Sequence, residues 1–238
     1  MKTFNEIKEQ KLYEGDKFDI ITTDGRKLRL VIEQDENPED PRCWDNLGTM
    51  LCYHRGYNLG DCNSKKETEE QLDEICRKYG KSDEELDEEM TMLEKFRFIL
   101  EQEDIYGLPL YLYEHSEISI STGRVDNFDS SFVGIIFVEK ETFFAQTCRK
   151  DDCDWKKEAE EMLRVEIETY SKYLEGEVYG WVLYEPVIIT KHNMKGEELS
   201  KFTVEEGEVV DSMGGFYNPT FEDIADYFDF KVASAEEI

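Results

Sequence analysis

The chain is short of positive charge. Its 238 residues hold 28 lysines and arginines against 57 aspartates and glutamates, so the formal net charge is −29. Because each contact with a phosphate needs a cation, this imbalance argues against direct binding to DNA, RNA or an anionic membrane. It is compatible with binding to the basic groove of a protein that handles nucleic acid. Solubility in a crowded cytoplasm is the simpler explanation of the same charge.

Long apolar runs are lacking as well. No stretch approaches the roughly 20 apolar residues that a membrane-spanning helix needs. The first residues, Met1 to Glu6, contain no apolar segment of the kind found in signal peptides. We therefore expect a cytoplasmic protein that has no membrane partner.

Short motifs of catalytic and metal chemistry are also missing. The six cysteines form no C-x-x-C pair, which removes zinc-finger spacing, and free thiols are expected in a reducing cytosol. The chain has no H-E-x-x-H motif, no G-x-S-x-G elbow and no Walker loop. Cys52 lies two residues from His54, but this spacing does not assure the geometry of a general base. We name no catalytic residue, and an enzyme remains only an alternative.

What is present predicts a folded α+β protein. Apolar residues make up 39% of the chain and aromatic residues 13%, which is enough for a core. Alternating apolar residues predict a hairpin over residues 18–33, turning at Asp24-Gly25. A helix is expected over about 153–174, stopped by Gly176. Further strands are expected at 108–113, 118–121, 133–138 and 178–184, with the third in the centre of a sheet because it is nearly all apolar.

A helical segment interrupts these strands. Ser64 with Glu67, and Ser82 with Glu85, have the spacing of capping boxes and predict the starts of two helices. Residues 65–104 hold 15 acids and 7 bases, so the outer faces of these helices are expected to be negative. The predicted fold is a mixed or antiparallel β-sheet core with an acidic helical hairpin insertion and a long helix packed on the sheet. The expected domains are a β-rich body, residues 1–63 and 105–238, and the insertion, residues 64–104.

The segment Cys43–Asp61 stands out from its acidic surroundings. It mixes Trp, Tyr, His, Cys, Asn and Gly and contains no Lys or Glu. Two of the three histidines, His54 and His115, lie in regions poor in glutamate, whereas His192 has the sequence of an exposed loop. Imidazoles beside carboxylates can bind Zn²⁺ or another divalent transition metal. The preferred ligands are Asp45, His54 and His115, with Asp129 or Asp61 completing the shell.

The metal site has a structural alternative. No short ligand motif supports it, and His54 and His115 are 61 positions apart. Both histidines could equally be half-buried side chains whose hydrogen bonds are satisfied within the fold. A metal, if bound, would be structural rather than catalytic unless it kept an open coordination position.

The same segment begins a series of sequence blocks. They read WDNLGTM (44–50), HR (54–55), YNLGD (57–61), LPLYLY (108–113), HS (115–116), DS (129–130), VG (133–134), ETY (168–170), YL (173–174), EVYG (177–180) and GFY (215–217). Together the blocks resemble a family of bacteriophage and prophage proteins. That family often has Asp-His-Ser-Gly where this chain has Glu114-His115-Ser116-Glu117, which retains the histidine and leaves the role of the preceding residue open.

The resemblance, taken with the charge, implies an inhibitor of a host defence system. The implied function is that of a type II-A anti-CRISPR protein, whose acidic faces meet the basic surfaces of Cas9 that hold guide RNA or target DNA. A metal would then pin the two histidine regions together. The alternative function is a metal-dependent hydrolase of a nucleotide or small phosphorylated substrate, and a third is an accessory protein with another host partner. The residues expected to contact the partner are Glu84, Glu85, Asp87, Glu88 and Glu89.

Overall fold

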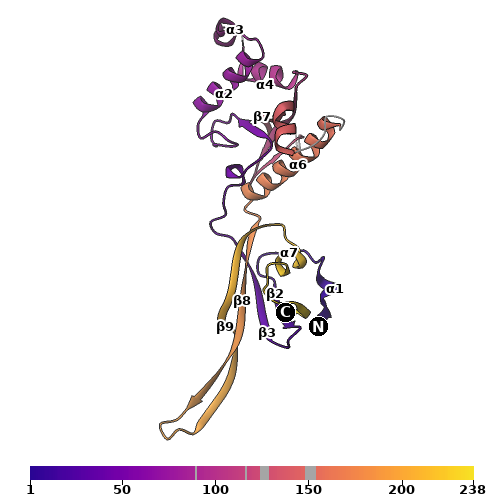
Figure 1. Cartoon of the computed structure of the whole chain (residues 1–238). Helices are drawn as coiled ribbons and strands as arrows, with labels where there is room; N and C mark the ends of the chain where they lie inside the picture. The colour runs from indigo at the N-terminus through magenta and orange to yellow at the C-terminus, as the bar shows by residue number, and fades with distance from the viewer. Residues whose placement is uncertain (89, 116, 124–128, 148–153) are drawn as a thin grey trace. The chain divides into compact units, whose positions relative to one another are not determined.

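The chain folds into two compact units, which Figure 1 shows in a computed structural model. The structure describes residues 1–88, 90–115, 117–123, 129–147 and 154–238, and of Asp87 and Glu88 it describes only the backbone. The first unit consists of Met1–Glu39 and Gly176–Ile238, and the second of Asp40–Glu175. Each unit has its own antiparallel sheet, so the predicted α+β class is confirmed.

The first unit is built on a six-stranded sheet in the order β1-β10-β2-β3-β8-β9. The β2–β3 hairpin turns at Gly25, which has a φ of +89°, as the sequence predicted. Phe18, Trp181 and Phe221 are the largest side chains of its core. Its elements are β1 (Lys2–Thr3), α1 (Phe4–Ile7), β2 (Lys17–Thr22), β3 (Lys27–Gln34), β8 (Val178–His192), β9 (Glu198–Tyr217), α7 (Phe221–Ala225) and β10 (Val232–Glu237).

The second unit has a four-stranded sheet in the order β4-β7-β5-β6. Its strands are β4 (Thr49–Cys52), β5 (Ile105–Glu114), β6 (Ile118–Ser121) and β7 (Ser130–Glu139). A 3₁₀ turn, η1 (Pro41–Cys43), precedes β4. The helices are α2 (Lys65–Lys78), α3 (Asp83–Glu88), α4 (Met92–Leu100), α5 (Lys140–Thr147) and α6 (Trp155–Leu174).

Helices cover both faces of this sheet. Ile136 of β7 packs in one apolar cluster with Leu163 and Ile167 of α6. Its neighbour Ile135 points to the other face and packs in a second cluster with Leu72 of α2 and Phe96 of α4. Because both faces of β7 are covered, the strand needs apolar residues at nearly every position, which is the pattern that predicted its central place.

The predicted domain division differs from the observed one. The expected β-rich body is divided between two units, and residues 64–104 form three helices that make one layer of the second unit. Apolar alternation identifies strands but not their partners, and the pairing of β3 with β8 joins segments from opposite ends of the chain. Ser64 and Ser82 do begin helices, since each hydroxyl accepts the N–H of the glutamate three residues later. Within the described ranges, no helix is long and apolar enough to cross a membrane.

Candidate functional site

Three of the expected metal ligands come to one end of the second sheet. β4 ends at Cys52, β5 ends at Glu114, and β7 begins at Ser130. Because β7 is antiparallel to both neighbours, its start lies beside their ends. His54, His115 and Asp129 are each within two residues of these strand ends. A shallow groove there is lined by Tyr53, His54, Arg55, Glu114, Asp129, Ser130, Ser131 and Phe132.

Tyr57 joins the two histidine regions. Its ring stacks on the His54 ring with centroids 5.2 Å apart, and its hydroxyl donates to Glu114 Oε1 at 3.1 Å. This hydrogen bond raises the pKa of Tyr57, because a phenolate beside a carboxylate is disfavoured. His115 stacks instead on Tyr113, with centroids 6.4 Å apart. An exposed tyrosine therefore connects the His54 region with Glu114, the neighbour of His115.

The remaining expected ligands lie elsewhere. Asp45 lines a different groove, together with Gln146, Met162 and Glu166. Asp61 is held by Arg42 through an ion pair of 2.7 Å. In the part of the chain that the structure describes, no three side chains of His, Cys, Asp or Glu are grouped so that they could hold a metal ion. The metal site stays a prediction, for which His54, His115 and Asp129 are the residues brought to one sheet end.

Arg42, which follows Pro41 in η1, is the centre of a buried network of charges. Its side chain is 3% exposed, and it donates from Nε to Asp61 at 2.7 Å and from Nη1 to Glu166 at 3.0 Å. Nη2 donates to the carbonyl oxygen of Gly48 at 2.7 Å. Burial alone would lower the pKa of Arg42, but the hydrogen bonds and charges of the two carboxylates raise it. The guanidinium therefore stays charged, and the carboxylates of Asp61 and Glu166 compensate its charge.

The two carboxylates also hold the backbone around β4. Asp61 Oδ2 accepts the N–H of Met50 at 2.7 Å. Glu166 Oε1, on α6, accepts the N–H groups of Leu47 and Gly48 at 2.8 and 3.1 Å. Hydrogen bonds from N–H groups to a carboxylate are among the stronger ones in proteins. Arg42, Asp61 and Glu166 thus hold η1, β4 and α6 together.

Arg42 and Glu166 were not predicted from the sequence to be site residues. Glu166 was not among the residues singled out from the sequence, although its side chain is only 14% exposed and belongs to the network. The available signal was its place on the apolar stripe of α6, one turn after Met162 and one turn before Tyr170. Tyr170 has a comparable role, because its hydroxyl accepts the N–H of Gly60 at 3.0 Å.

Cys52 has no arrangement suited to nucleophilic catalysis. The side chain is 5% exposed on β4 and belongs to the apolar cluster beneath α6. Burial is the largest cause that raises the pKa of its thiol, and the charge of Asp61 raises it further. Burial of this kind favours the protonated thiol over the nucleophilic thiolate.

The expected partner-binding acids lie in and after α3. Glu84 is exposed. Glu85 caps the same helix, because its carboxylate accepts from the N–H of Ser82 at 2.9 Å and from Lys81 Nζ at 2.8 Å. These contacts lower the pKa of Glu85 to about 2. Asp87 and Glu88 are described only as backbone, and Glu89 lies outside the described residues.

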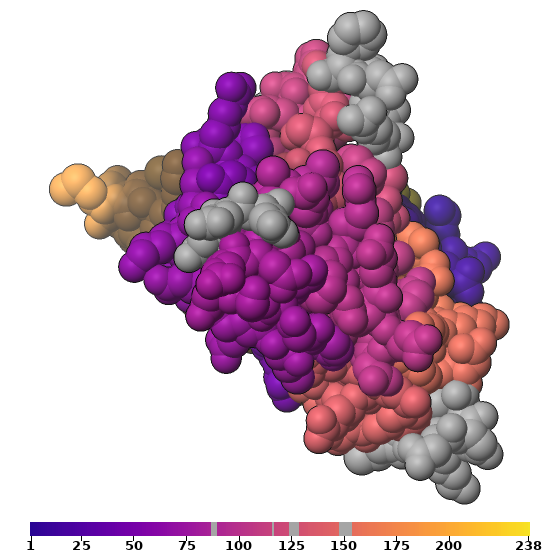
Figure 2. Space-filling model, turned by 90° about the horizontal axis from the view of Figure 1, so that it is seen from above, coloured from indigo at the N-terminus to yellow at the C-terminus, as the bar shows by residue number. Residues whose placement is uncertain are grey.

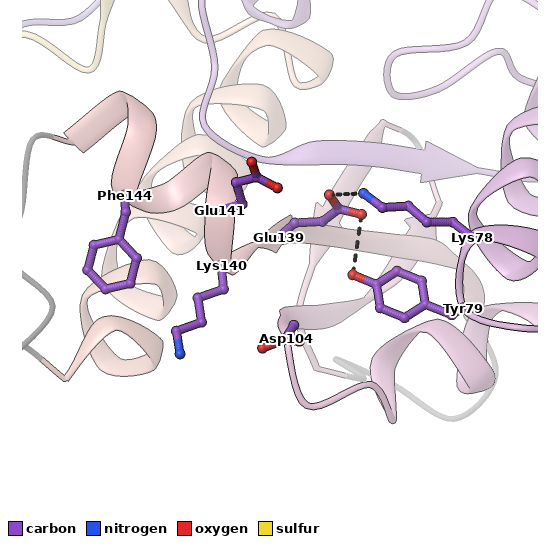
Figure 3. Close-up of a pocket in the computed structure, with 7 residues that line it drawn as sticks. All are labelled: Lys78, Tyr79, Asp104, Glu139, Lys140, Glu141 and Phe144. Carbon is purple, nitrogen blue, oxygen red and sulfur yellow. Dashed lines mark hydrogen bonds and ion pairs between the residues drawn. The ribbon is translucent and has the colours of Figure 1, made fainter.

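A second groove lies at the opposite end of the same sheet (Figure 3). There Glu139, the last residue of β7, accepts from Lys78 Nζ at 2.5 Å and from the Tyr79 hydroxyl at 3.4 Å. Lys140 lines it too, and so do the acids Asp104 and Glu141. The groove therefore contains two lysines and three carboxylates. Its net charge is not positive, so it is not suited to binding a phosphorylated ligand.

Comparisons with family models, with curated proteins and with solved structures each found no match.

Proposed function

We propose that this protein is a bacteriophage or prophage inhibitor that binds a basic, nucleic-acid-handling protein of its host. The candidate partner is Cas9 or its complex with guide RNA in the bacterial cytoplasm, and the step blocked is binding of target DNA. The sequence blocks that resemble phage proteins support the origin. The observation that carries the mechanism is the acidic outer surface of α2, α3 and α4.

The bases of this surface are already engaged. Five of its seven lysines and arginines make ion pairs with acids of the second unit. A sixth, Lys65, lies 5.6 Å from the centre of the Tyr53 ring. Lys95 is paired within the fold and the other four pairs lie at the surface, so these cations are offset by acids and an excess of exposed carboxylates remains. The exposed acids of this layer and the loop after it are Glu70, Glu74, Asp83, Glu84, Glu94, Glu101, Glu103 and Asp104.

These acids are spread over one continuous layer. Figure 2 looks onto the second unit, and the violet to magenta surface of residues 65–104 faces the viewer. A surface of this charge resembles a nucleic-acid backbone in sign and would accelerate encounter with a cationic groove. It would also repel nucleic acid itself, so an inhibitor of this kind competes with DNA and does not bind it.

Ionic strength provides the first test. Exposed charge pairs contribute about 0–1 kcal/mol each and are screened by salt, so binding carried by many of them should weaken steeply as salt rises. Immobilised Cas9–guide complex should retain the protein at low salt and release it at high salt. Failure to retain it at any salt concentration would refute the proposal for this partner.

Charge reversal localises the surface. The double variant Glu74→Lys with Glu84→Lys changes two exposed acids on α2 and α3 and should slow association by roughly tenfold. Glu14→Lys changes an exposed acid of the first unit and serves as the matched control. Equal binding by the double variant and the control would show that another surface makes the contact.

A metal-dependent hydrolase of a nucleotide or small phosphorylated substrate is the second candidate. It is favoured by one observation, that His54, His115 and Asp129 reach the same end of the sheet. Elemental analysis of the purified protein tests it, because a hydrolase of this kind needs stoichiometric metal. If metal is present, His54→Ala should abolish turnover with an unchanged melting temperature when the metal is catalytic. A lowered melting temperature instead would indicate a structural metal.

A further inference from the structure

The hairpin of β8 and β9 continues far beyond the rest of the first sheet (Figure 1). β3 pairs with β8 only from Tyr179 to Tyr184, and the residues of β8 that follow pair with β9 alone. We call residues 187–204 the distal ribbon. A ribbon of two strands is marginally stable by itself in water. We therefore expect the distal ribbon to pack against another protein surface in the functional state.

Exposed apolar side chains occupy the distal ribbon. Ile189 and Phe202 are cross-strand partners and are 40% and 43% exposed. Val187 and Val204 form the next pair on the same face, two residues along each strand. Ile188, on the other face, is 58% exposed. An exposed ladder of this kind is typical of an interface rather than of a solvated hairpin.

The charge of the distal ribbon differs from that of the chain. It carries three lysines, Lys191, Lys195 and Lys201, against two glutamates, although the whole chain has a net charge of −29. At the base of the ribbon, Glu185 and Glu208 are direct cross-strand partners, an arrangement of like charges that destabilises a strand pair. The outer part of the hairpin is therefore slightly basic. At its base Glu185 and Glu208 repel each other, whereas the nearby Glu205 and Glu206 are paired with Arg29 and Lys17.

We propose that two copies of this chain form a dimer through their distal ribbons. The ribbons pack antiparallel about a two-fold axis, with the faces of Ile189 and Phe202 in contact. In this orientation Lys191, whose ammonium lies 5.5 Å from the centre of its own Phe202 ring, and Lys195 in the turn lie against the base of the other ribbon, where they offset the repulsion between Glu185 and Glu208.

A second copy fits this surface better than other partners do. Elsewhere two chains of −29 repel each other, so the slightly basic ribbon is where they can approach. A nucleic acid would meet the same repulsion from the rest of the molecule. Pairing through the ribbon does not depend on the acidic surface of the second unit, and a dimer is expected whether or not the proposed inhibition is correct.

Sedimentation equilibrium of the full chain tests the dimer. The wild-type protein should associate reversibly to a dimer, and Phe202→Glu should weaken the association roughly tenfold or more, since it places a charge in the apolar contact. Val165→Glu is the matched control, because Val165 is an apolar residue of α6 that is 63% exposed. Circular dichroism confirms that each variant is folded.

If Phe202→Glu disturbs the hairpin itself, a pair of charge-reversal variants still tests the dimer. Lys191→Glu should weaken the dimer, and adding Glu208→Lys to it should restore much of the lost affinity if the ribbons pack antiparallel. A wild-type protein that is monomeric at every concentration would overturn the proposal. So would a dimer that neither Phe202→Glu nor Lys191→Glu weakens, or a ribbon whose variants lose binding only to another macromolecule.

Discussion

Replacing Arg42 by methionine should destabilise the second unit strongly. The guanidinium is 3% exposed and is paired with Asp61 and Glu166, whose side chains are 26% and 14% exposed. Removing one partner from a buried ion pair costs about 3–5 kcal/mol because a charge is left uncompensated. Both carboxylates keep hydrogen bonds to backbone N–H groups, which places the expected loss near the lower end, at about 3 kcal/mol.

Urea unfolding of wild type and variant measures this loss. Hydrogen exchange should locate it in β4 and α6, which the network joins. Lys66→Met is the control, since Lys66 is 84% exposed in its pair with Glu70 and should change stability by at most about 0.5 kcal/mol. Adding Asp61→Asn and Glu166→Gln to Arg42→Met should recover part of the loss, because no uncompensated charge then remains. A loss under about 1 kcal/mol for Arg42→Met would refute the central place given to this network.

Two further predictions concern single positions. Gly134→Ala should lower the free energy of unfolding by about 1–3 kcal/mol, because a Cβ there would overlap the carbonyl oxygen of Leu51. Gly80→Ala is the comparison, because no described atom lies within 4 Å of a Cβ there, although its positive φ of +97° adds some backbone strain. Glu85 should titrate near pH 2 by NMR, below its ordinary value of 4.5. Its depressed pKa means that its stabilising contribution is present above pH 4.5 and is lost as pH falls towards 2, so Glu85→Gln should flatten the pH dependence of stability in that window.

The parts of the fold predicted from the sequence are those with a clear local period. The β2–β3 hairpin has alternation and a glycine turn, and α6 has an apolar stripe that ends before Gly176. β10 was not predicted, because Val-Ala-Ser-Ala-Glu-Glu has little strand propensity and becomes a strand by pairing with β2, more than 200 positions away. The division into two units depends on such distant pairings.

The composition of the sequence drew attention to the segment around β4, but it did not predict the contacts that this segment makes. The sequence singled out residues 43–61 because they mix Trp, Tyr, His, Cys, Asn and Gly and contain no Lys or Glu. It could not show that Arg42 meets Glu166, because these residues are 124 positions apart and no local pattern links them. The side chains that hold the segment are an arginine, two carboxylates and a tyrosine, which form hydrogen bonds with it or with one another.

Competition with target DNA tests the central claim most directly. Fluorescence anisotropy of labelled target DNA bound to Cas9–guide complex should fall as the wild-type protein is added at low salt. The Glu74→Lys, Glu84→Lys variant should need roughly tenfold more protein for the same effect, and Glu14→Lys should behave as wild type. DNA binding that is unchanged by the wild-type protein at every salt concentration would contradict the account.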